Sequence, residues 1–308
     1  MKRFIKKILV LCAILLIGAI VMDVVFTKIF KSGRTVKAQW LNNMHGQHYD
    51  LVITGSSRAW WNIDMHRINS SCGIRSVNLA TNHFRPAEIL LALKIFLANG
   101  NSVDRMLLEL DYMKKSESDQ VFSATIYDHL PWLKDELVYD HLRSRSNEFF
   151  WLRHIPFARY ARYNSLWGPE EAIITLLDKR RTLFDSTGSY FTDDEFSGYA
   201  QLQLNDIVIQ YDEDLAEVFN LCRKNGIEVE VFMAPYYRLR VRAGAKEEFN
   251  ELMDRYGVAF HDHSDRLDST IHFNDNWHLG RHGGEVYTQM LIDELICPGG
   301  AIVPAGTE

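Results

Sequence analysis

The sequence predicts an α/β protein with a mostly parallel, five-stranded, doubly wound sheet in three layers, a large helical insertion and an N-terminal transmembrane helix. Three features indicate this architecture. Short apolar segments alternate with helical segments on both sides of a long, aromatic-rich interruption, and a basic head with a long apolar run opens the chain. Strands that alternate with helices form parallel sheets, because each return to the same sheet edge needs a crossover whose helix then covers the sheet.

The first thirty residues have the composition of a membrane anchor. Basic residues between Lys2 and Lys7 precede an apolar run from Ile8 to Met22, which Asp23 interrupts and Val24–Phe26 resumes. This length is close to the ~20 residues that a bilayer-spanning helix needs. A cleaved signal peptide also has a basic head, but it requires small residues at its cleavage site, and only Gly18-Ala19 in mid-run comes close. We therefore expect residues 1–30 to be an uncleaved signal-anchor.

The charges around this segment set its expected orientation. A seven-residue head is too short to hold a domain, so we expect the head inside and the body on the outer or periplasmic side. Basic residues from Lys28 to Lys37 weaken the charge asymmetry that governs orientation. The alternative is a buried amphipathic helix, which Arg3, Lys6 and Lys7 fit poorly.

The first half of the α/β domain contains three expected strands and one helix. The apolar run Asp50–Gly55 is typical of a buried strand, and its glycine tolerates a tight turn. Arg75–Ala80 is the second strand. Pro86–Ala98 is expected to be helical, because it has proline in its first turn and apolar residues at helical spacing. Val103–Leu110 is the third strand.

The second half repeats this alternation. Asp212–Asn225 has helical spacing and ends at a glycine. Ile227–Ala234 is a strand of alternating Val and Glu closed by proline, and Lys246–Tyr256 is a helix that also ends at a glycine. Val258–Phe260 is the last short strand, and Arg281–Leu295 is the final helix. In such sheets the ligand crevice lies at the carboxyl ends of the strands, so residues that follow the strands are the candidates for chemistry.

The domain organisation follows from these elements. We expect a linker over 31–49, the α/β domain over 50–112 and 201–296, the insertion over 113–200 and a flexible tail over 297–308. The insertion is interpreted as a lid, substrate wall or docking surface, or as an ordinary helical subdomain whose aromatic residues fill its own core.

Composition excludes some classes of protein. The 308 residues are 47% hydrophobic and 24% charged, which argues against wholesale disorder, and the net charge of −6 argues against nucleic-acid binding. Four cysteines are too few for a disulfide scaffold. Cys12 lies in the span, Cys222 is expected to be a core thiol, and Cys72 and Cys297 could pair in an oxidising compartment, which the sequence does not decide.

A candidate nucleophile follows the first strand. In Thr54-Gly-Ser-Ser-Arg-Ala59, Ser57 falls at a strand-to-helix turn at the carboxyl edge of the sheet. The N–H groups of the helix N-terminus can stabilise an oxyanion during acyl transfer. The alternative is that Ser56 or Ser57 only caps the helix.

A candidate base lies far downstream in Asn274-Asp-Asn-Trp-His-Leu279. A serine hydroxyl becomes nucleophilic when a histidine takes its proton and a carboxylate fixes the imidazole tautomer. Asp275 and His278 are three residues apart before the last helix, so one carboxylate can reach the ring. The alternative is a surface loop with a polar Asp and a His packed on Trp277.

Together, these blocks and the five-strand rhythm resemble the SGNH/GDSL hydrolase superfamily over about Asp50 to Leu295, without the insertion. The resemblance implies that Ser57 is the nucleophile, His278 the base and Asp275 the orienting carboxylate. It also implies a flavodoxin-like arrangement of the sheet and a serine hydrolase activity.

The chain departs from the family pattern at three blocks. The usual G-D-S is Gly55-Ser56-Ser57, the second block Asn78–Asn82 lacks a glycine, and Glu109-Leu-Asp111 replaces G-x-N-D. An ionised Asp111 would oppose an oxyanion, so Asn82 is the expected side-chain donor beside the helix N-terminus at Ser57. These features, with the anchor, are similar to the membrane-anchored branch of cell-surface O-acylation proteins, of the D-alanyl transfer and alginate acetylation types.

The resemblance implies an envelope-anchored serine acyl-hydrolase or O-acyltransferase that acts on ester-linked acyl groups of a cell-surface glycan, with a membrane-bound O-acyltransferase as a possible partner. The alternatives are a non-catalytic glycan-binding scaffold, which the altered G-x-N-D block favours, and a plain lipase or esterase. No nucleotide-binding loop is present, so no cofactor is expected. A histidine cluster near the end lacks a convincing zinc spacing, so no metal is expected; its members are His261, His263, His272, His278 and His282.

Overall fold

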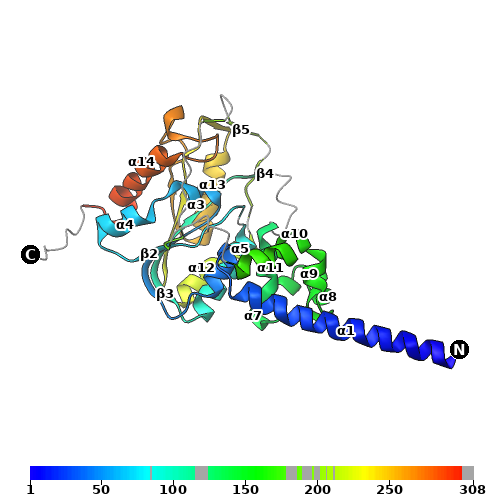
Figure 1. Ribbon diagram of the computed structural model, residues 1–308. Coiled ribbons are helices and arrows are strands. Elements are labelled where there is room, and N and C mark those ends of the chain that lie inside the picture. The colour runs from blue at the N-terminus through cyan, green and yellow to red at the C-terminus, as the bar shows by residue number, and fades with distance from the viewer. Residues whose placement is uncertain are drawn as a thin grey trace, which may run out of the picture. The chain divides into compact units, whose positions relative to one another are not determined.

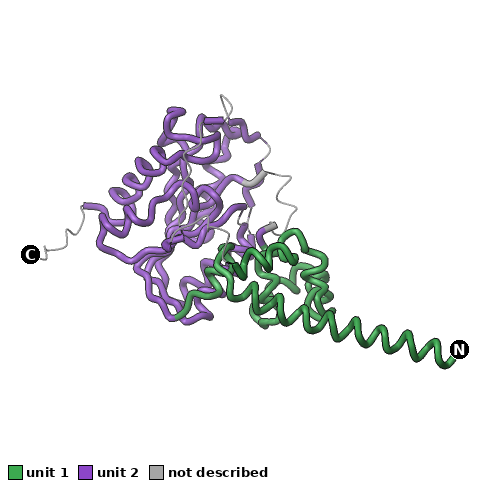
Figure 2. Tube along the Cα trace, in the orientation of Figure 1, with its two compact units in different colours: residues 1–45, 126–182 green, residues 46–125, 183–308 purple. Residues whose placement is uncertain are grey.

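The computed structural model describes residues 1–83, 85–114, 124–177, 186–188, 196–197, 202–205, 207–210 and 212–299 (Figure 1). The chain forms two compact units (Figure 2). The helical unit comprises Met1–His45 and Ile126–Thr182, and the sheet unit comprises Gly46–Thr125 and Leu183–Glu308. Parts of the predicted insertion and the tail from residue 300 onward lie outside the described residues.

The sheet unit is built on a five-stranded parallel sheet, as the sequence predicts. Its spatial order is β2-β1-β3-β7-β9. In chain order this is 2-1-3-4-5, so the chain reverses direction across the sheet between β1 and β3 and creates a ligand crevice at their carboxyl ends. The strands are β1 (His48–Thr54), β2 (Ser76–Asn78), β3 (Ser102–Glu109), β7 (Glu228–Met233) and β9 (Ala259–Asp262).

The register centres on β1. Val52 pairs with Val77 of β2 and with Met106 of β3, and all three residues are about 1% exposed. Burial on both faces explains why β1 is an uninterrupted apolar run rather than an alternating one. Two further strand pairs, β4 (Met113–Lys114) with β6 (Ile207–Val208) and β5 (Leu202–Leu204) with β8 (Leu239–Val241), were not predicted, because two or three residues are too few to show a periodicity.

The predicted helices of the sheet unit are present. They are α5 (Pro86–Ala98), α12 (Glu213–Lys224), α13 (Ala245–Tyr256) and α14 (Arg281–Leu291), which a π-helical turn over Ile292–Ile296 extends. Two short helices, α3 (Ser57–Asn62) and α4 (Met65–Cys72), fill the connection after β1, and a 3₁₀ turn, η2, covers Thr270–His272. Local signals delimit α4, since Asp64 caps its first turn and Gly73 ends it in the left-handed conformation.

A disulfide closes the sheet unit. Cys72 at the end of α4 is bonded to Cys297 after the π-helical turn, with Cα atoms 6.0 Å apart and a separation of 225 positions in sequence. The pairing that the sequence leaves open is therefore present, and Cys222 is a buried free thiol as expected.

The helical unit begins with the 30-residue helix α1 (Lys2–Lys31), which is long and apolar enough to cross a membrane. Residues 31–49, expected to be a linker, contain α2 (Lys37–Asn42) and the first residues of β1. The rest of the unit consists of short helices, which confirms that the insertion is largely helical: η1 (Ala124–Trp132), α7 (Glu136–Arg143), α8 (Glu148–His154), α9 (Ala158–Arg162), α10 (Asn164–Trp167) and α11 (Pro169–Leu176).

Helix α1 changes character at Asp23. Up to Met22 nearly every residue is exposed, whereas Asp23, Phe26 and Phe30 are buried within the helical unit. The Asp23 carboxylate forms an ion pair with the buried Arg159 at 2.9 Å and a second one with Lys134. The charge that interrupts the apolar run is therefore a paired core residue of the folded unit.

Candidate active site

Ser57 lies at the turn between β1 and α3. Gly55 forms this turn with φ +141°, and a side chain there would also collide with β3, since an ideal Cβ would lie 2.6 Å from the carbonyl oxygen of Glu109. Ser56 is the N-cap of α3, and its hydroxyl accepts a hydrogen bond from the Arg58 N–H. Because Ser56 provides the cap, the hydroxyl of Ser57 is available for another role.

Ser57, His278 and Asp275 form a continuous chain of hydrogen bonds. Ser57 Oγ lies 2.7 Å from His278 Nε2, and His278 Nδ1 lies 2.9 Å from Asp275 Oδ2. The carboxylate requires a proton on Nδ1, so Nε2 is left to accept the proton of the serine hydroxyl. Residues 221 positions apart in sequence thus meet as the motifs predict.

Asp275 is held as an anion. Its Oδ1 accepts hydrogen bonds from the backbone N–H groups of Trp277 at 2.6 Å and His278 at 2.8 Å. Burial opposes ionisation, but the bond to the His278 ring and these backbone donors outweigh burial and lower the pKa of Asp275. A permanently charged carboxylate at this position can stabilise the imidazolium that forms when the serine is deprotonated.

The loop that carries His278 is fixed to α3. Leu279 donates its N–H to the Oδ1 atom of buried Asn62 at 3.0 Å, and Asn274 donates its N–H to the His278 carbonyl oxygen at 2.9 Å. The Trp61 ring packs on the imidazole with centroids 4.7 Å apart. Helix α3, which begins at Ser57, therefore positions His278 directly.

Arg58, the residue after the nucleophile, is buried beneath the site. Its side chain is 1% exposed, forms an ion pair with Asp111 and donates to the carbonyl oxygens of Ala234 and Pro235. Its guanidinium stacks on Tyr236, 3.4 Å from the ring centroid. One side chain thus connects the ends of β1, β3 and β7. This role of Arg58 was not predicted from the sequence.

The two acids of the Glu109-Leu-Asp111 segment have pKa values that are shifted in opposite directions. Burial and the negative charge of Asp111 raise the pKa of Glu109 well above its usual value, which favours its neutral form. Burial opposes ionisation of Asp111 as well, but the Arg58 guanidinium and several hydrogen bonds lower its pKa. Its charge is therefore compensated by Arg58, which weakens the repulsion that an uncompensated Asp111 would exert on an oxyanion. A signal for this cluster was present in the sequence, as an Arg after the nucleophile and an E-L-D block.

A cavity of about 360 Å³ opens beside Ser57 and His278. This volume lies at the small end of the range for small-molecule sites. Polar residues, including Asp111 and Arg85, line the part near the nucleophile. Much of the remaining wall is apolar and is formed by Pro86, Ile89, Leu110, Val208, Ile209, Leu215, Phe249, Leu252 and Met253.

The two expected oxyanion donors, the Ser57 N–H and the Asn82 side chain, differ in their position relative to the cavity. Among the described residues, no group accepts a hydrogen bond from the Ser57 backbone N–H, so it can donate to a ligand. Asn82 is half-buried, and its neighbour Thr81 donates its N–H to the Gly55 carbonyl oxygen at 3.4 Å. The cavity wall includes His83 but not Asn82, so the role of Asn82 stays a prediction. The Asn78 amide instead donates to the Ala59 carbonyl oxygen and has a structural role.

The remaining histidines of the C-terminal cluster have individual partners. His261 contacts Glu230 at 2.8 Å, His263 contacts the Tyr287 hydroxyl at 3.0 Å, and the ring of His272 stacks on that of His282.

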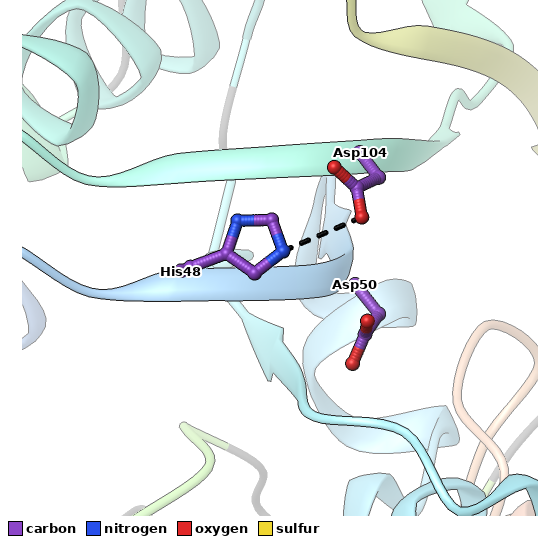
Figure 3. Close-up of side chains that lie close together, drawn as sticks. All are labelled: His48, Asp50 and Asp104. Atoms are coloured by element: carbon purple, nitrogen blue, oxygen red, sulfur yellow. Dashed lines mark ion pairs between the residues drawn. The ribbon is translucent and has the colours of Figure 1, made fainter.

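Within the described part of the chain, one group of side chains has metal-ligand chemistry: His48, Asp50 and Asp104 (Figure 3). His48 Nε2 lies 3.4 Å from Asp104 Oδ2, and both side chains are more than half exposed. One oxygen of the Asp50 carboxylate lies within 4.8 Å of the ligand atoms of this pair, and the carboxylate accepts the Arg75 N–H at 2.6 Å. The arrangement is that of a surface ion pair at the amino ends of β1 and β3.

Comparison with known proteins finds no family model that matches the chain and no curated protein with significant similarity. The function is therefore inferred from the geometry of the site and from the motifs.

Proposed function

We propose that this protein is an envelope-anchored serine acyl-hydrolase or O-acyltransferase of the SGNH/GDSL type, with its three-layer fold, acting on ester-linked acyl groups of a cell-surface glycan. The observation that carries the proposal is the Ser57–His278–Asp275 hydrogen-bond chain at the mouth of a cavity. Its distances are those of a general base within reach of its nucleophile.

The proposed reaction has two steps. The Ser57 Oγ attacks the ester carbonyl carbon while His278 Nε2 takes the hydroxyl proton, and Asp275 stabilises the imidazolium. The Ser57 N–H, with Asn82 as the candidate second donor, stabilises the oxyanion. The C–O bond to the leaving alcohol then breaks, His278 returns the proton to the alkoxide, and the acyl group remains on Ser57.

In the second step, the acceptor decides between hydrolysis and transfer. His278 removes a proton from water or from a glycan hydroxyl, that oxygen attacks the acyl-enzyme, and Ser57 recovers its proton. Transfer needs an acyl donor on the outer face, so a membrane-bound O-acyltransferase is the expected partner. The apolar cavity wall supports an acyl group as the part of the substrate that enters the site.

The anchor and the disulfide support an extracytoplasmic location. Helix α1 has the length and composition of a single span. The Cys72–Cys297 bond is typical of an oxidising compartment, which supports an outer or periplasmic location for the sheet unit.

A non-catalytic glycan-binding scaffold is the second candidate. The replacement of the family's G-x-N-D block by Glu109-Leu-Asp111 favours it, because Asp111 stands where the family has a neutral Asn donor and its pKa is lowered. The triad favours catalysis, since binding alone does not require the imidazole to face the serine hydroxyl.

Labelling with a fluorophosphonate probe distinguishes the two. We expect the wild type to be labelled, Ser57→Ala to be unlabelled and His278→Ala to react far more slowly. Ser70→Ala is the matched control, because this exposed serine bonds only to the Arg67 carbonyl oxygen and should label as the wild type does. If the folded wild type is not labelled but binds envelope glycan, the scaffold is the correct interpretation.

A further inference from the structure

An apolar patch on α8 lies near the point where α1 leaves the helical unit. We define the α8 patch as Phe150, Trp151 and Ile155, which are 38%, 60% and 50% exposed. Trp151 and Ile155 are four residues apart and share a helix face, and the Ile155 N–H donates to the Trp151 carbonyl oxygen. The opposite face of α8 is buried through Phe149 and Leu152. The patch is therefore an outward surface of a well-packed helix.

Contacts within the helical unit locate this patch. The Phe157 N–H, two residues after Ile155, donates to the Asp23 carboxylate at 3.2 Å, and the Phe157 ring contacts Phe26 with centroids 5.1 Å apart. Asp23 is the first buried residue of α1. Helix α8 accordingly lies at the end of the unit from which the exposed half of α1 emerges (Figure 1).

The length of the exposed half of α1 predicts how deep the α8 patch lies relative to the bilayer. From Ile8 to Val25, α1 has 18 residues, which span ~27 Å at ~1.5 Å per residue. This matches the ~30 Å hydrocarbon core of a bilayer. With Lys6 and Lys7 at one boundary, the other boundary falls near Asp23, level with the end of α8. Aromatic side chains are enriched at that level in membrane proteins.

The net charge of the helical unit also favours contact with a membrane surface. It holds 17 of the chain's 34 Lys and Arg but 9 of its 40 Asp and Glu, a net charge of +8 in a protein whose total is −6. Four of those basic residues precede the span, which leaves +4 for the body of the unit. A unit with a net positive charge is attracted to anionic lipid headgroups.

We propose that the α8 patch inserts into the outer interface of the bilayer that α1 spans, so that the helical unit is seated on lipid instead of being tethered at a distance. The inference rests on the proposed membrane span. A continuous helix from span to folded unit leaves no flexible linker between them, and the patch adds a second contact with the same membrane. Contact between the α8 patch and lipid would hold the helical unit at a fixed height above the membrane.

Site-directed fluorescence in lipid vesicles tests this. The full chain with Cys12→Ala and Cys222→Ala keeps its disulfide, and Trp151→Cys then gives a single site for an environment-sensitive nitrobenzoxadiazole probe. The protein is reconstituted in phosphatidylcholine vesicles with a fraction of phosphatidylglycerol. We expect lipids with a spin label near the headgroup to quench most of this emission.

Two further positions separate the possible outcomes. Leu176 on α11 is the matched control, because it is 64% exposed in the same unit but follows Thr175, which lies against Gly33. Gly33 is ten residues beyond Asp23, about 15 Å further from the membrane at 1.5 Å per residue. A probe at Leu176→Cys should not be quenched, whereas one at Leu15→Cys within the span should be quenched by deep spin labels.

Each result has one meaning. If the Leu15 probe is quenched but the Trp151 probe is not, the patch does not contact lipid and the inference is overturned while the anchor stands. If the Leu15 probe is not quenched, the proposed span itself fails. A Trp151 probe with blue-shifted emission in native membranes but no lipid quenching would indicate a protein partner on the patch, which also overturns the proposal.

Discussion

Replacing Arg58 by methionine removes the charge that organises the base of the site while keeping much of its buried volume. The guanidinium is 1% exposed and contacts Asp111, the Glu109 carboxyl at 3.7 Å and two backbone carbonyl oxygens. Without it, Asp111 becomes a buried carboxylate with no compensating charge. Removing one partner of a buried ion pair costs about 3–5 kcal/mol, a large part of the ~5–15 kcal/mol by which a domain is stable.

The pH dependence of this penalty has a definite sign. In the wild type the pKa of Asp111 is lowered, so this carboxylate stabilises the fold above the unfolded pKa of ~3.9, and the contribution is lost as the pH falls through the folded pKa. In Arg58→Met, the guanidinium no longer offsets burial, so burial should raise that pKa above the unfolded value. The group then costs stability increasingly as the pH rises, so the penalty should be larger at pH 7 than at pH 5.

Urea unfolding of the detergent-solubilised full chain at pH 5 and pH 7 measures both effects. Asp111→Asn in the Arg58→Met background should recover part of the loss at pH 7, because it removes the unpaired charge. Arg75→Met is the matched control, since this exposed guanidinium rests on Tyr49 and its loss should cost less than about 1 kcal/mol. A loss below about 1 kcal/mol in Arg58→Met, or a penalty that is equal at both pH values, would refute the reasoning.

Three further predictions concern the disulfide, the cavity and the catalytic groups. Cys72→Ser with Cys297→Ser should lower the free energy of unfolding by up to about 5 kcal/mol from loop entropy, and a reductant should shift the wild-type urea midpoint but not that of the double variant. With p-nitrophenyl esters, kcat/KM should rise about fourfold (~0.8 kcal/mol) for each methylene added to the acyl group, until the cavity is filled. Leu252→Phe should shorten the preferred acyl group. A maximum at acetate would contradict this prediction. Asp275→Asn should reduce kcat by ~10⁴ and Asn82→Ala by ~10²–10³, and an unchanged rate in the latter would remove Asn82 from the oxyanion site.

Much of the sheet unit was predictable because its signals are local. The five strands and the helices α5, α12 and α13 each show their own periodicity and their own Pro, Gly or Asp boundary. The meeting of Ser57 with His278 was also predictable despite their separation, since both blocks follow strands whose carboxyl ends converge in a parallel sheet. The long apolar helix α1 was likewise predictable, because the capacity to span a bilayer depends on the length and composition of a single segment.

Only the tertiary structure decided the partners of charged and sulfur-containing residues. Asp23 is an interruption of an apolar run in the sequence and a paired core residue in the structure, and Arg58 is buried with two acids whose pKa values are shifted in opposite directions. The Cys72–Cys297 bond and the apolar wall of the cavity likewise join segments far apart in the chain. Hydrophobic periodicity reports whether a residue's own element faces the core, whereas the stability and pKa of a buried charge depend on groups that other elements bring to it.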